Sequence, residues 1–461
     1  MIVAPGEVDM AKRIIVVGGG AAGMGAAGAA QGTDPDATVT ILTSFEDAAY
    51  SPCGIPYVHG KEIPDFDRLF MATKQHYVDQ GLDFRYQTTV TAIDTKARTV
   101  TLESGEVLGY DSLVLATGFD YAPTGVPGES GPGLYYVKNI REAMEWDKTL
   151  DSVRSAVVIE GGPLGAEMVT ALAERGIETH LVDSAAWAMS MATDPDIIKP
   201  VEDEWREAGV HLHYSTKLEA FLRNPDGTLR GVATSDGEIT ADLAVIATHK
   251  VASTALAKAA GIKLGMSGGV IVDAGMQTSA PGVFAAGDVA EIPHGVSNVP
   301  IQGLSGSHAY AQGKVAGTRA AGGVRDYHAV YVPWGMMAGK SMLGGVSFSE
   351  TLATALGLDY VAGNATGISR ARYYPGVKPV TVKLLAEPKT GRLIGAQLIG
   401  GEGIKERTDF LAMCVRKGLT LEDLATMENV YSPGIGALNE PIALAAQATL
   451  ANLAKLAKAG A

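Results

Sequence analysis

Short apolar runs followed by glycine-rich turns dominate the first part of the chain. Residues 12–17 (KRIIVV) lead directly into GGGAAGMGAAGAA, and residues 39–42 (VTIL) form the next apolar run. Short continuous apolar runs are typical of buried strands, and the small residues between them predict a helix packed closely on a sheet. The pattern therefore predicts a βαβ unit of about 30 residues.

The same pattern returns about 140 residues later. Residues 155–159 (SAVVI) are followed by EGGPLGAEMVTALAERG and then by ETHLVD, which ends at Asp183. Further strand-and-loop segments occur at 112–118 (SLVLATG) and 282–288 (GVFAAGD). Two βαβ units predict two nucleotide-binding domains of Rossmann-like α/β architecture.

From about residue 330 the pattern changes to longer strands followed by helices. The strand-like segments are VYVPW, PVTVKLLAE and LIGAQLIG, and the helix-like ones are DFLAMCVRKGL and LNEPIALAAQATLANLAKLAKAG. We interpret this region as a third, α+β domain, most simply one that forms a subunit interface. The predicted fold class is therefore α/β, with two Rossmann-like domains and a C-terminal α+β dimerisation domain.

Composition and charge narrow the function. The 461 residues carry a net charge of −14 and no basic cluster, which argues against a nucleic-acid partner. No apolar run reaches the ~18 residues of a membrane span, and nothing in residues 1–11 resembles a signal peptide. Two cysteines, Cys53 and Cys414, fit a reducing cytoplasm. Glycine is abundant, at 57 residues, and clusters in the loops after apolar runs, which favours a nucleotide-binding enzyme.

The first glycine loop has the spacing of a dinucleotide site. Gly18-x-Gly20-x-x-Gly23 follows a strand and opens a helix, so a pyrophosphate can rest on the helix N-terminus. The next strand is followed by Thr43 and Ser44, where such folds usually carry an acid for the ribose hydroxyls. We expect these hydroxyls to take that role, unless the nearby Glu46 does.

The second loop departs from this pattern. Glu160 stands at the tight-turn position, with Gly162 and Gly165 at the other two. Asp183 ends the following strand, where it can accept from a ribose, and residues 184–189 contain no Arg or Lys for a 2′-phosphate. NADH is therefore favoured over NADPH. The alternative is a pocket that has lost its cofactor, because a carboxylate beside a pyrophosphate is electrostatically unfavourable.

Cys53 stands in YSPCGIPY, just ahead of an apolar helical start. A helix N-terminus favours the thiolate, which is the nucleophilic form of cysteine. From these residues alone, an inert cysteine in a Pro/Gly turn is an equal alternative. Cys414 lies inside the apolar helix pattern DFLAMCVRKGL and is expected to belong to the core.

The motifs GGGAAGMGAA, YSPCGIPY, LVLATG, TSAPGVFAAGD, RARYYPGVKP and VYSPGIGALNEP resemble those of the flavoprotein disulfide reductase superfamily. The chain is most similar to its single-cysteine branch of coenzyme A-disulfide reductases, NADH oxidases and persulfide or polysulfide reductases. The resemblance implies FAD and NADH as cofactors. The residues expected to hold FAD are Gly18, Gly20, Ala22, Gly23, Thr43, Ser44, Thr117, Gly118, Gly287 and Asp288; those expected to hold NADH are Gly162, Gly165 and Asp183.

The resemblance also implies a catalytic group. Cys53 is expected at the flavin, cycling between thiolate and a mixed disulfide or sulfenate, without a second cysteine nearby. Tyr431 matches the tyrosine that reaches across the dimer toward the cysteine, with simple interface packing as the alternative. Tyr374, beside Tyr373, occupies the other site-facing segment. A homodimer follows from the same resemblance.

Two departures bear on the substrate. Relatives that use coenzyme A carry basic residues where this chain has Ala-Ala-Gln-Gly at 29–32, and a lysine where it has Asn439. Their loss disfavours coenzyme A, because its phosphates need cationic partners. Lys61, Arg68 and Lys74 are candidate substitutes, although solvated surface charge is the favoured interpretation. His249 replaces a glycine of relatives and, with Glu160, indicates an altered NADH domain.

We therefore expect an enzyme that passes electrons from NADH through FAD to a low-molecular-weight disulfide, persulfide or polysulfide by way of Cys53. The alternatives are an NADH oxidase, a flavin-bearing redox sensor or flavoenzyme with another donor, and a reductase of a non-sulfur acceptor. The expected domains are 1–118 with 250–324 for FAD, 119–249 for NADH, and 325–461 for the subunit interface.

Overall fold

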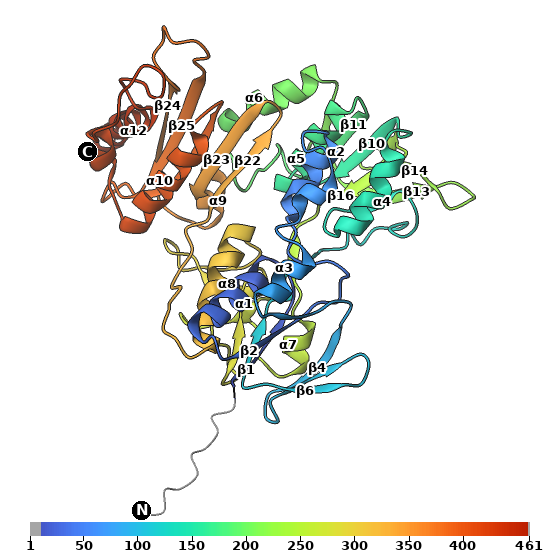
Figure 1. Ribbon diagram of the computed structural model, residues 1–461. Helices are drawn as coiled ribbons and strands as arrows, with labels where there is room; N and C mark the ends of the chain where they lie inside the picture. The colour runs from blue at the N-terminus through green and yellow to red at the C-terminus, as the bar shows by residue number, and fades with distance from the viewer. Residues whose placement is uncertain (1–10, 460–461) are drawn as a thin grey trace, which may run out of the picture. The chain divides into compact units, whose positions relative to one another are not determined.

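The chain divides into two compact units in the computed structural model, which describes residues 11–459 (Figure 1). Unit 1 comprises Met1–Ser51, Asp67–Asp120 and Lys250–Val330, and unit 2 comprises Pro52–Phe66, Tyr121–His249 and Tyr331–Ala461. Residues 1–10, on which the expectation about a signal peptide rests, lie outside the described residues. The two units are described separately below.

A five-stranded parallel sheet forms the centre of unit 1. Its order is β19-β7-β1-β2-β3, so the first apolar run lies between two neighbours and is buried. Ile14 of β1 pairs with Val39 of β2 on one side and with Ser112 of β7 on the other. The strands are β1 (Arg13–Val17), β2 (Thr38–Leu42), β3 (Asp83–Arg85), β7 (Ser112–Leu115) and β19 (Val283–Ala285).

Two helices rich in small residues pack against each other beside this sheet. They are α1 (Ala21–Thr33) and α8 (Gly306–Ala320) (Figure 1). A Cβ on Gly313 would lie 2.1 Å from the carbonyl oxygen of Ala22, and one on Gly317 would lie 1.9 Å from that of Ala26. The glycines of α8 therefore permit its close packing on the small residues of α1, which the sequence predicted only to pack on the sheet.

The remaining elements of unit 1 are short. They are α3 (Lys74–Asp79), α7 (Ala255–Ala259), the antiparallel sheet of β4 (Val90–Asp94), β5 (Thr99–Leu102) and β6 (Val107–Gly109), the sheet of β18 (Val270–Ile271), β20 (Ala290–Pro293) and β21 (Pro300–Ile301), and the pair of β8 (Phe119–Tyr121) and β17 (Lys250–Ala252).

Unit 2 contains a second parallel sheet, of order β12-β11-β10-β16-β9. Its strands are β9 (Leu134–Tyr136), β10 (Ser155–Ile159), β11 (Glu178–Val182), β12 (His211–His213) and β16 (Leu243–Ile246). The helices of this part are α4 (Ile140–Leu150), α5 (Pro163–Glu174) and α6 (Pro195–Glu207), and a small antiparallel sheet has β13 (Leu218–Arg223), β14 (Leu229–Thr234) and β15 (Gly237–Thr240). The predicted repetition of the βαβ unit is therefore present.

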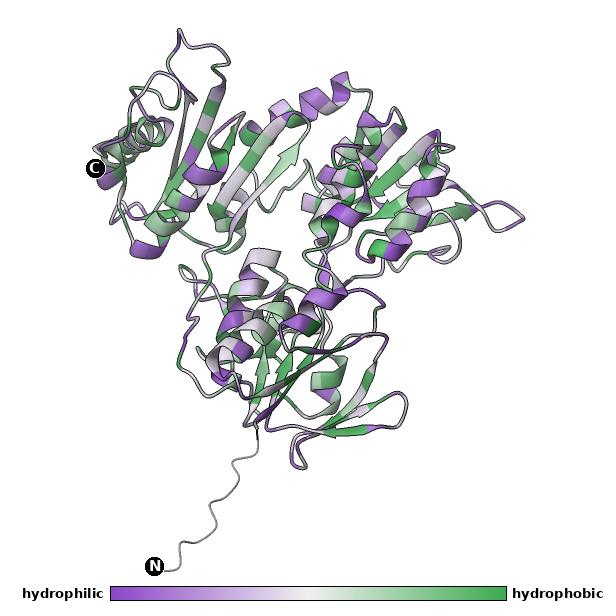
Figure 2. Cartoon of the chain, viewed as in Figure 1, coloured by the Kyte–Doolittle hydropathy of each residue, from purple (hydrophilic) through white to green (hydrophobic). Residues whose placement is uncertain are grey.

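An antiparallel sheet of order β22-β23-β26-β25-β24 makes up the rest of unit 2. The strands are β22 (Pro333–Ala338), β23 (Ser341–Ser347), β24 (Val361–Ile368), β25 (Pro379–Ala386) and β26 (Leu393–Gly400). Helix α10 (Ile404–Lys417) packs on β23 and β26, and α12 (Pro441–Ala459) packs on β24 and β25, with α9 (Glu350–Ala355) and α11 (Leu421–Ala425) alongside. Figure 2 shows that the strands of this sheet are largely hydrophobic.

One strand prediction was displaced. Residues 330–334 were expected to form a strand, but β22 begins only at Pro333. Val332 has a φ of +47°, a left-handed conformation that interrupts an extended strand at a β-branched residue. The α/β class with a C-terminal α+β domain is confirmed. Among residues 11–459, none of the helices combines the length and apolar character required to traverse a bilayer.

Candidate functional site

The three glycines of the first loop serve three different purposes. Gly18 has a φ of +117°, and a Cβ there would lie 2.1 Å from the carbonyl oxygen of Ala116. A Cβ on Gly23 would lie 1.8 Å from the carbonyl oxygen of Gly18, so α1 could not begin this close to β1 with a larger residue. Gly20, by contrast, would meet nothing of the chain within 4 Å.

The open space at Gly20 fits a ligand. Gly20 is the N-cap of α1 and no side chain caps the helix there, so its first N–H groups are available to an anion. The chain itself does not need glycine at this position, whereas close approach of a dinucleotide pyrophosphate does. Ala22 and Gly287 meet behind the loop, where a Cβ on Gly287 would lie 2.8 Å from that of Ala22. The residues present fit FAD.

Four of the other predicted residues of unit 1, Thr117, Gly118, Gly287 and Asp288, lie in the loops that follow β7 and β19. The hydroxyl of Thr117 donates to the carbonyl oxygen of Ser253 at 2.8 Å, and the carbonyl oxygen of Gly118 accepts from the N–H of Ser253 at 3.0 Å. Asp288 is buried, and its Oδ2 lies 3.1 Å from Nζ of Lys250. Sequence reasoning missed Lys250, which belongs to unit 1 and directly follows the expected NADH domain, 119–249.

The hydroxyls after β2 differ in their surroundings. Thr43 is buried, and its Oγ1 accepts from the N–H of Phe45 at 3.4 Å. Ser44 is exposed. Of the two, Ser44 therefore presents its hydroxyl to solvent, while that of Thr43 helps to form its own turn.

The second glycine loop repeats the geometry of the first, with a residue other than glycine in the turn. Glu160 has a φ of +71° and takes the left-handed conformation that Gly18 holds in unit 1. A Cβ on Gly165 would lie 2.0 Å from the carbonyl oxygen of Glu160, and one on Gly162 would meet nothing within 4 Å. Gly162 is the N-cap of α5. This loop too leaves space for a dinucleotide pyrophosphate.

Asp183 is largely engaged with the backbone. Its Oδ2 accepts from the N–H of Gly161 at 2.7 Å and its Oδ1 from that of Ala185 at 2.8 Å. These bonds tie the end of β11 to the loop after β10. Each carboxylate oxygen has a second lone pair, so Asp183 can still accept from a ribose hydroxyl.

Glu160 and His249 are neighbours at the same edge of the sheet, because β10 and β16 lie side by side. Burial raises the pKa of the Glu160 carboxyl, and the nearby charge of Asp183 raises it further. His249 opposes both effects through its ring and through a hydrogen bond from its backbone N–H. The two departures from the family pattern therefore compensate each other in part, which the sequence did not indicate.

Cys53 stands in a single 3₁₀ turn, Pro52–Gly54, immediately before α2 (Ile55–His59). Its side chain is exposed, whereas Cys414 is buried as expected, and burial raises the pKa of the Cys414 thiol to about 11. The two cysteines therefore differ in accessibility to a soluble substrate. The prediction that Cys414 belongs to the core is confirmed.

A buried ionic group anchors the segment that carries Cys53. Nδ1 of His59 lies 2.9 Å from Oδ1 of Asp147 on α4, and Nη1 of Arg175 lies 2.7 Å from the same oxygen. Arg175 also donates to the carbonyl oxygen of His59 at 3.2 Å, and the His59 ring lies 4.1 Å from that of Trp146. Burial lowers the pKa of His59. These contacts fix the Cys53 segment to α4 and to the end of α5.

Tyr57 and Glu167 form a second link between this segment and α5. The phenol of Tyr57 donates to Oε1 of Glu167 at 3.2 Å. Burial raises the pKa of Glu167 to about 7, and the bond from Tyr57 partly opposes this. Sequence reasoning missed Glu167, although a carboxylate within the apolar pattern PLGAEMVTALAE was a signal for it. Perturbed carboxyl groups of this kind are typical of functional sites.

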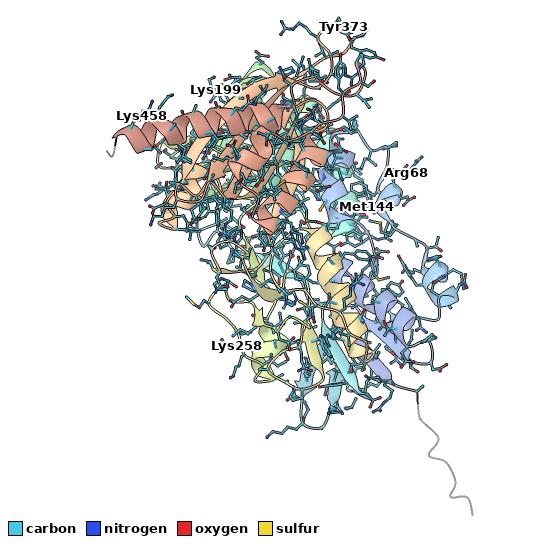
Figure 3. The ribbon with its side chains drawn as sticks, turned by 90° about the vertical axis from the view of Figure 1, so that its left-hand side faces the viewer. Arg68, Met144, Lys199, Lys258, Tyr373 and Lys458 are labelled. Carbon is cyan, nitrogen blue, oxygen red and sulfur yellow. The ribbon has the colours of Figure 1, made fainter. Side chains whose placement is uncertain are left out.

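Two of the tyrosines singled out in the sequence lie close together in unit 2. The hydroxyl of Tyr431 lies 3.2 Å from that of Tyr373, not from that of Tyr374. Tyr373 projects from the periphery of the unit (Figure 3) and is 75% exposed. The ring of Tyr374 packs beside Gly434 and lies 5.8 Å from the guanidinium of Arg370.

Two of the three candidate cations, Lys61 and Lys74, have ordinary surface contacts. Nζ of Lys61 lies 3.5 Å from Oδ1 of Asp151, and Lys74 donates to the carbonyl oxygen of Glu46 at 2.7 Å. Arg68 lies on the surface of the first part of the chain (Figure 3). These contacts agree with the interpretation of solvated surface charge.

Two dinucleotide cradles and an exposed thiol on one chain define a flavin-dependent oxidoreductase that uses a pyridine nucleotide. Residues 12–313 match the pyridine nucleotide-disulphide oxidoreductase model and residues 341–438 match the dimerisation domain of the same family. The chain belongs to this family, and the predicted resemblance is confirmed.

Known relatives cover the chain almost completely. It is 30% identical over 455 residues to an NADH oxidase of Methanocaldococcus jannaschii, covering 96% of this chain and 99% of the relative. It is 28% identical over 452 residues to an NAD(P)H coenzyme A polysulfide/persulfide reductase of Pyrococcus horikoshii, with 95% and 98% covered. The solved structure of an NAD-dependent persulfide reductase from A. fulgidus superposes with a TM-score of 0.91 at 28% identity, covering 97% of this chain and 84% of that one.

Proposed function

We propose that the enzyme reduces a low-molecular-weight disulfide, persulfide or polysulfide with electrons from NADH. The observation that carries this proposal is the exposed thiol of Cys53 in a chain whose other cysteine is buried. Because Cys414 is buried, the proposed mixed disulfide forms between Cys53 and the substrate itself. FAD, when bound, supplies the two-electron carrier between nicotinamide and sulfur.

The reaction at Cys53 balances as a thiol–disulfide exchange. The thiolate attacks one sulfur of the substrate, the S–S bond breaks, and the other sulfur leaves as a thiolate that takes a proton. Two electrons then break the mixed disulfide, which restores the Cys53 thiolate and releases the second thiol after protonation. Overall, one disulfide, one NADH and one proton give two thiols and NAD⁺.

The chain's own residues divide the remaining work. In this proposal, residues 1–118 and 250–324 bind FAD, 119–249 bind NADH, and 325–461 form the subunit interface. His59 and Tyr57 hold the Cys53 segment against helices α4 and α5. The absence of Arg and Lys from residues 184–189 and the position of Asp183 support NADH over NADPH.

A homodimer completes the proposed enzyme. Exposed apolar side chains in the segment 430–438 support it, since Val430, Ile435 and Leu438 are each at least 70% exposed. Tyr431 lies in the same segment, and its phenol can donate to a leaving sulfur. The proposed catalytic tyrosines are Tyr431 and Tyr374. Because the hydroxyl of Tyr373 lies 3.2 Å from that of Tyr431, we add Tyr373 to them.

An NADH oxidase is the second candidate, and the relative from M. jannaschii favours it. In that case oxygen is the acceptor and Cys53 passes through sulfenate. The missing basic residues at 29–32 and at Asn439 disfavour coenzyme A as a tightly bound substrate under either proposal.

An anaerobic titration with NADH tests the proposal on the wild type and on Cys53→Ser. We expect NADH to bleach the flavin of both proteins, with a long-wavelength thiolate–flavin band in the wild type alone. Turnover with a disulfide or polysulfide should then require Cys53. Rapid consumption of oxygen with no turnover of any sulfur acceptor would favour the oxidase. Bleaching by dithionite but not by NADH or NADPH would refute both functions.

A further inference from the structure

A cluster of three histidines and a glutamate lies at one edge of the parallel sheet of unit 2, in residues without a role in the proposed function. Glu178 and His180 lie two residues apart on β11, and His211 and His213 lie two residues apart on β12. His180 pairs directly with His211 in the strand register. Because side chains two residues apart share one face of a strand, all four project from the same face.

The potential ligand atoms lie close together. Oε1 of Glu178 is 3.6 Å from Nε2 of His180 and 3.5 Å from Nε2 of His211, and all three atoms lie within 4.8 Å of one another. A tetrahedral zinc site with bonds of about 2.0–2.1 Å separates its ligand atoms by about 3.3–3.4 Å. The two distances from Glu178 are only slightly longer than this. The third separation, between the two imidazole nitrogens, is at most 4.8 Å, and binding requires the half-exposed His211 ring to turn toward His180.

His213 is placed as an outer partner. Its Nε2 lies 3.1 Å from Nδ1 of His180, the nitrogen that faces away from Glu178. A histidine that binds a metal through one nitrogen usually hydrogen-bonds through the other, which fixes its tautomer and orientation. The rings are stacked, with centroids of His180 and His211 4.6 Å apart and those of His180 and His213 5.4 Å apart.

Exposure also suits a metal ion. The side chain of His180 is 14% exposed, whereas those of Glu178 and His211 are 58% and 53% exposed. Solvent can therefore reach the centre of the cluster and supply a water as a fourth ligand. Burial lowers the pKa of His180, which favours the neutral ring that metals bind.

We propose that Glu178, His180 and His211 bind one divalent transition metal ion of the zinc class, with His213 orienting His180. Two imidazoles and one carboxylate suit Zn²⁺, Co²⁺ or Ni²⁺ better than Mg²⁺ or Ca²⁺, which prefer oxygen ligands. The ion joins the edge strand β12 to β11 near the beginning of both strands. Asp183 follows the end of β11, and the second glycine loop follows the end of the parallel neighbour β10, so the site is separate from the proposed NADH site.

The test measures binding of Zn²⁺ by the FAD-loaded protein in a Cys53→Ser background, which removes the exposed thiol as a competing ligand. Calorimetric titration with ZnCl₂ should give one ion per chain. His211→Gln should abolish binding, and His213→Gln should weaken it about 10–100-fold. His328→Gln is the matched control, because His328 is an exposed histidine of unit 1 and should leave binding unchanged.

Two further readouts separate loss of the site from loss of the fold. Circular dichroism and flavin content of His211→Gln should equal those of the parent. Saturating Zn²⁺ should raise the melting temperature of the parent and of His328→Gln, but not that of His211→Gln. Co²⁺ bound at this site should show the visible absorption of a four-coordinate ion. The proposal is refuted if the parent binds no Zn²⁺ with a Kd below about 0.1 mM, or if His211→Gln binds as the parent does.

Discussion

The close approach of helix α5 to strand β10 makes Gly165→Ala an informative substitution. A methyl group at this position would lie 2.0 Å from the carbonyl oxygen of Glu160, and Cβ contacts below 3.0 Å are essentially never found in proteins. The neighbour is backbone and cannot rotate away. The start of α5 must therefore move by about 1 Å or more from the end of β10.

Two effects follow from that movement. Overpacking of this kind lowers the free energy of unfolding by about 1–3 kcal/mol. The higher helix propensity of Ala offsets up to about 1 kcal/mol of this loss. We therefore expect unit 2 to lose about 1–2 kcal/mol of stability. A displacement of about 1 Å at a binding element can cost about 100-fold in rate, so reduction of the flavin by NADH should slow by that order.

Gly162→Ala is the matched comparison. Gly162 has a φ of −65°, which alanine adopts without strain, and its new methyl group would meet no atom of the chain. Stability should be unchanged or rise by about 0.4–1 kcal/mol. Binding of NADH should nevertheless weaken, because the methyl group occupies the space that we assign to the pyrophosphate.

Stopped-flow reduction by NADH under anaerobic conditions, with dithionite bleaching as the measure of flavin content, distinguishes the two variants. Thermal unfolding gives the stability of each. Wild-type reduction rates in Gly165→Ala would refute the argument that close packing of α5 sets the geometry of the NADH site. An unchanged Kd for NADH in Gly162→Ala would refute the position assigned to the pyrophosphate.

Two further predictions concern buried charge in unit 2. Lys383 is buried, with its Nζ 3.1 Å from Oδ2 of Asp194, so Lys383→Met should lower the free energy of unfolding by about 3–5 kcal/mol. Lys199 is exposed, so Lys199→Met should lower it by at most about 1 kcal/mol. Equal melting temperatures of the two variants would contradict this reasoning. The pKa of Glu167 is raised from 4.5 to about 7, so the folded state holds a proton that the unfolded state has released, and wild-type stability falls as pH rises through that interval. Glu167→Gln should remove this fall, worth up to about 3 kcal/mol, in unfolding measured at pH 5 and pH 8; parallel pH profiles would contradict the shift.

The local pattern predicted much of the fold. Both βαβ units, the helix starts after Gly20 and Gly162, and the burial of Cys414 follow from short-range rules of periodicity and turn chemistry. The displaced start of β22 shows the limit of such rules, because the left-handed conformation of Val332 has no signal in an apolar β-branched run.

The sequence by itself determined the class of protein, because glycine spacing, strand length and the position of Cys53 are properties of contiguous residues. Only the tertiary structure decided which distant residues meet. The order of a parallel sheet differs from the order of its strands in the chain, so β10 lies beside β16 and Glu160 meets His249. The register between β11 and β12 places His180 beside His211. The pairing of Tyr373 with Tyr431 and the anchoring of His59 by Asp147 likewise depend on packing between elements far apart in sequence. Contacts of this kind are set by the packing of whole helix and sheet faces against one another. The two contacting residues by themselves therefore do not predict that they will meet.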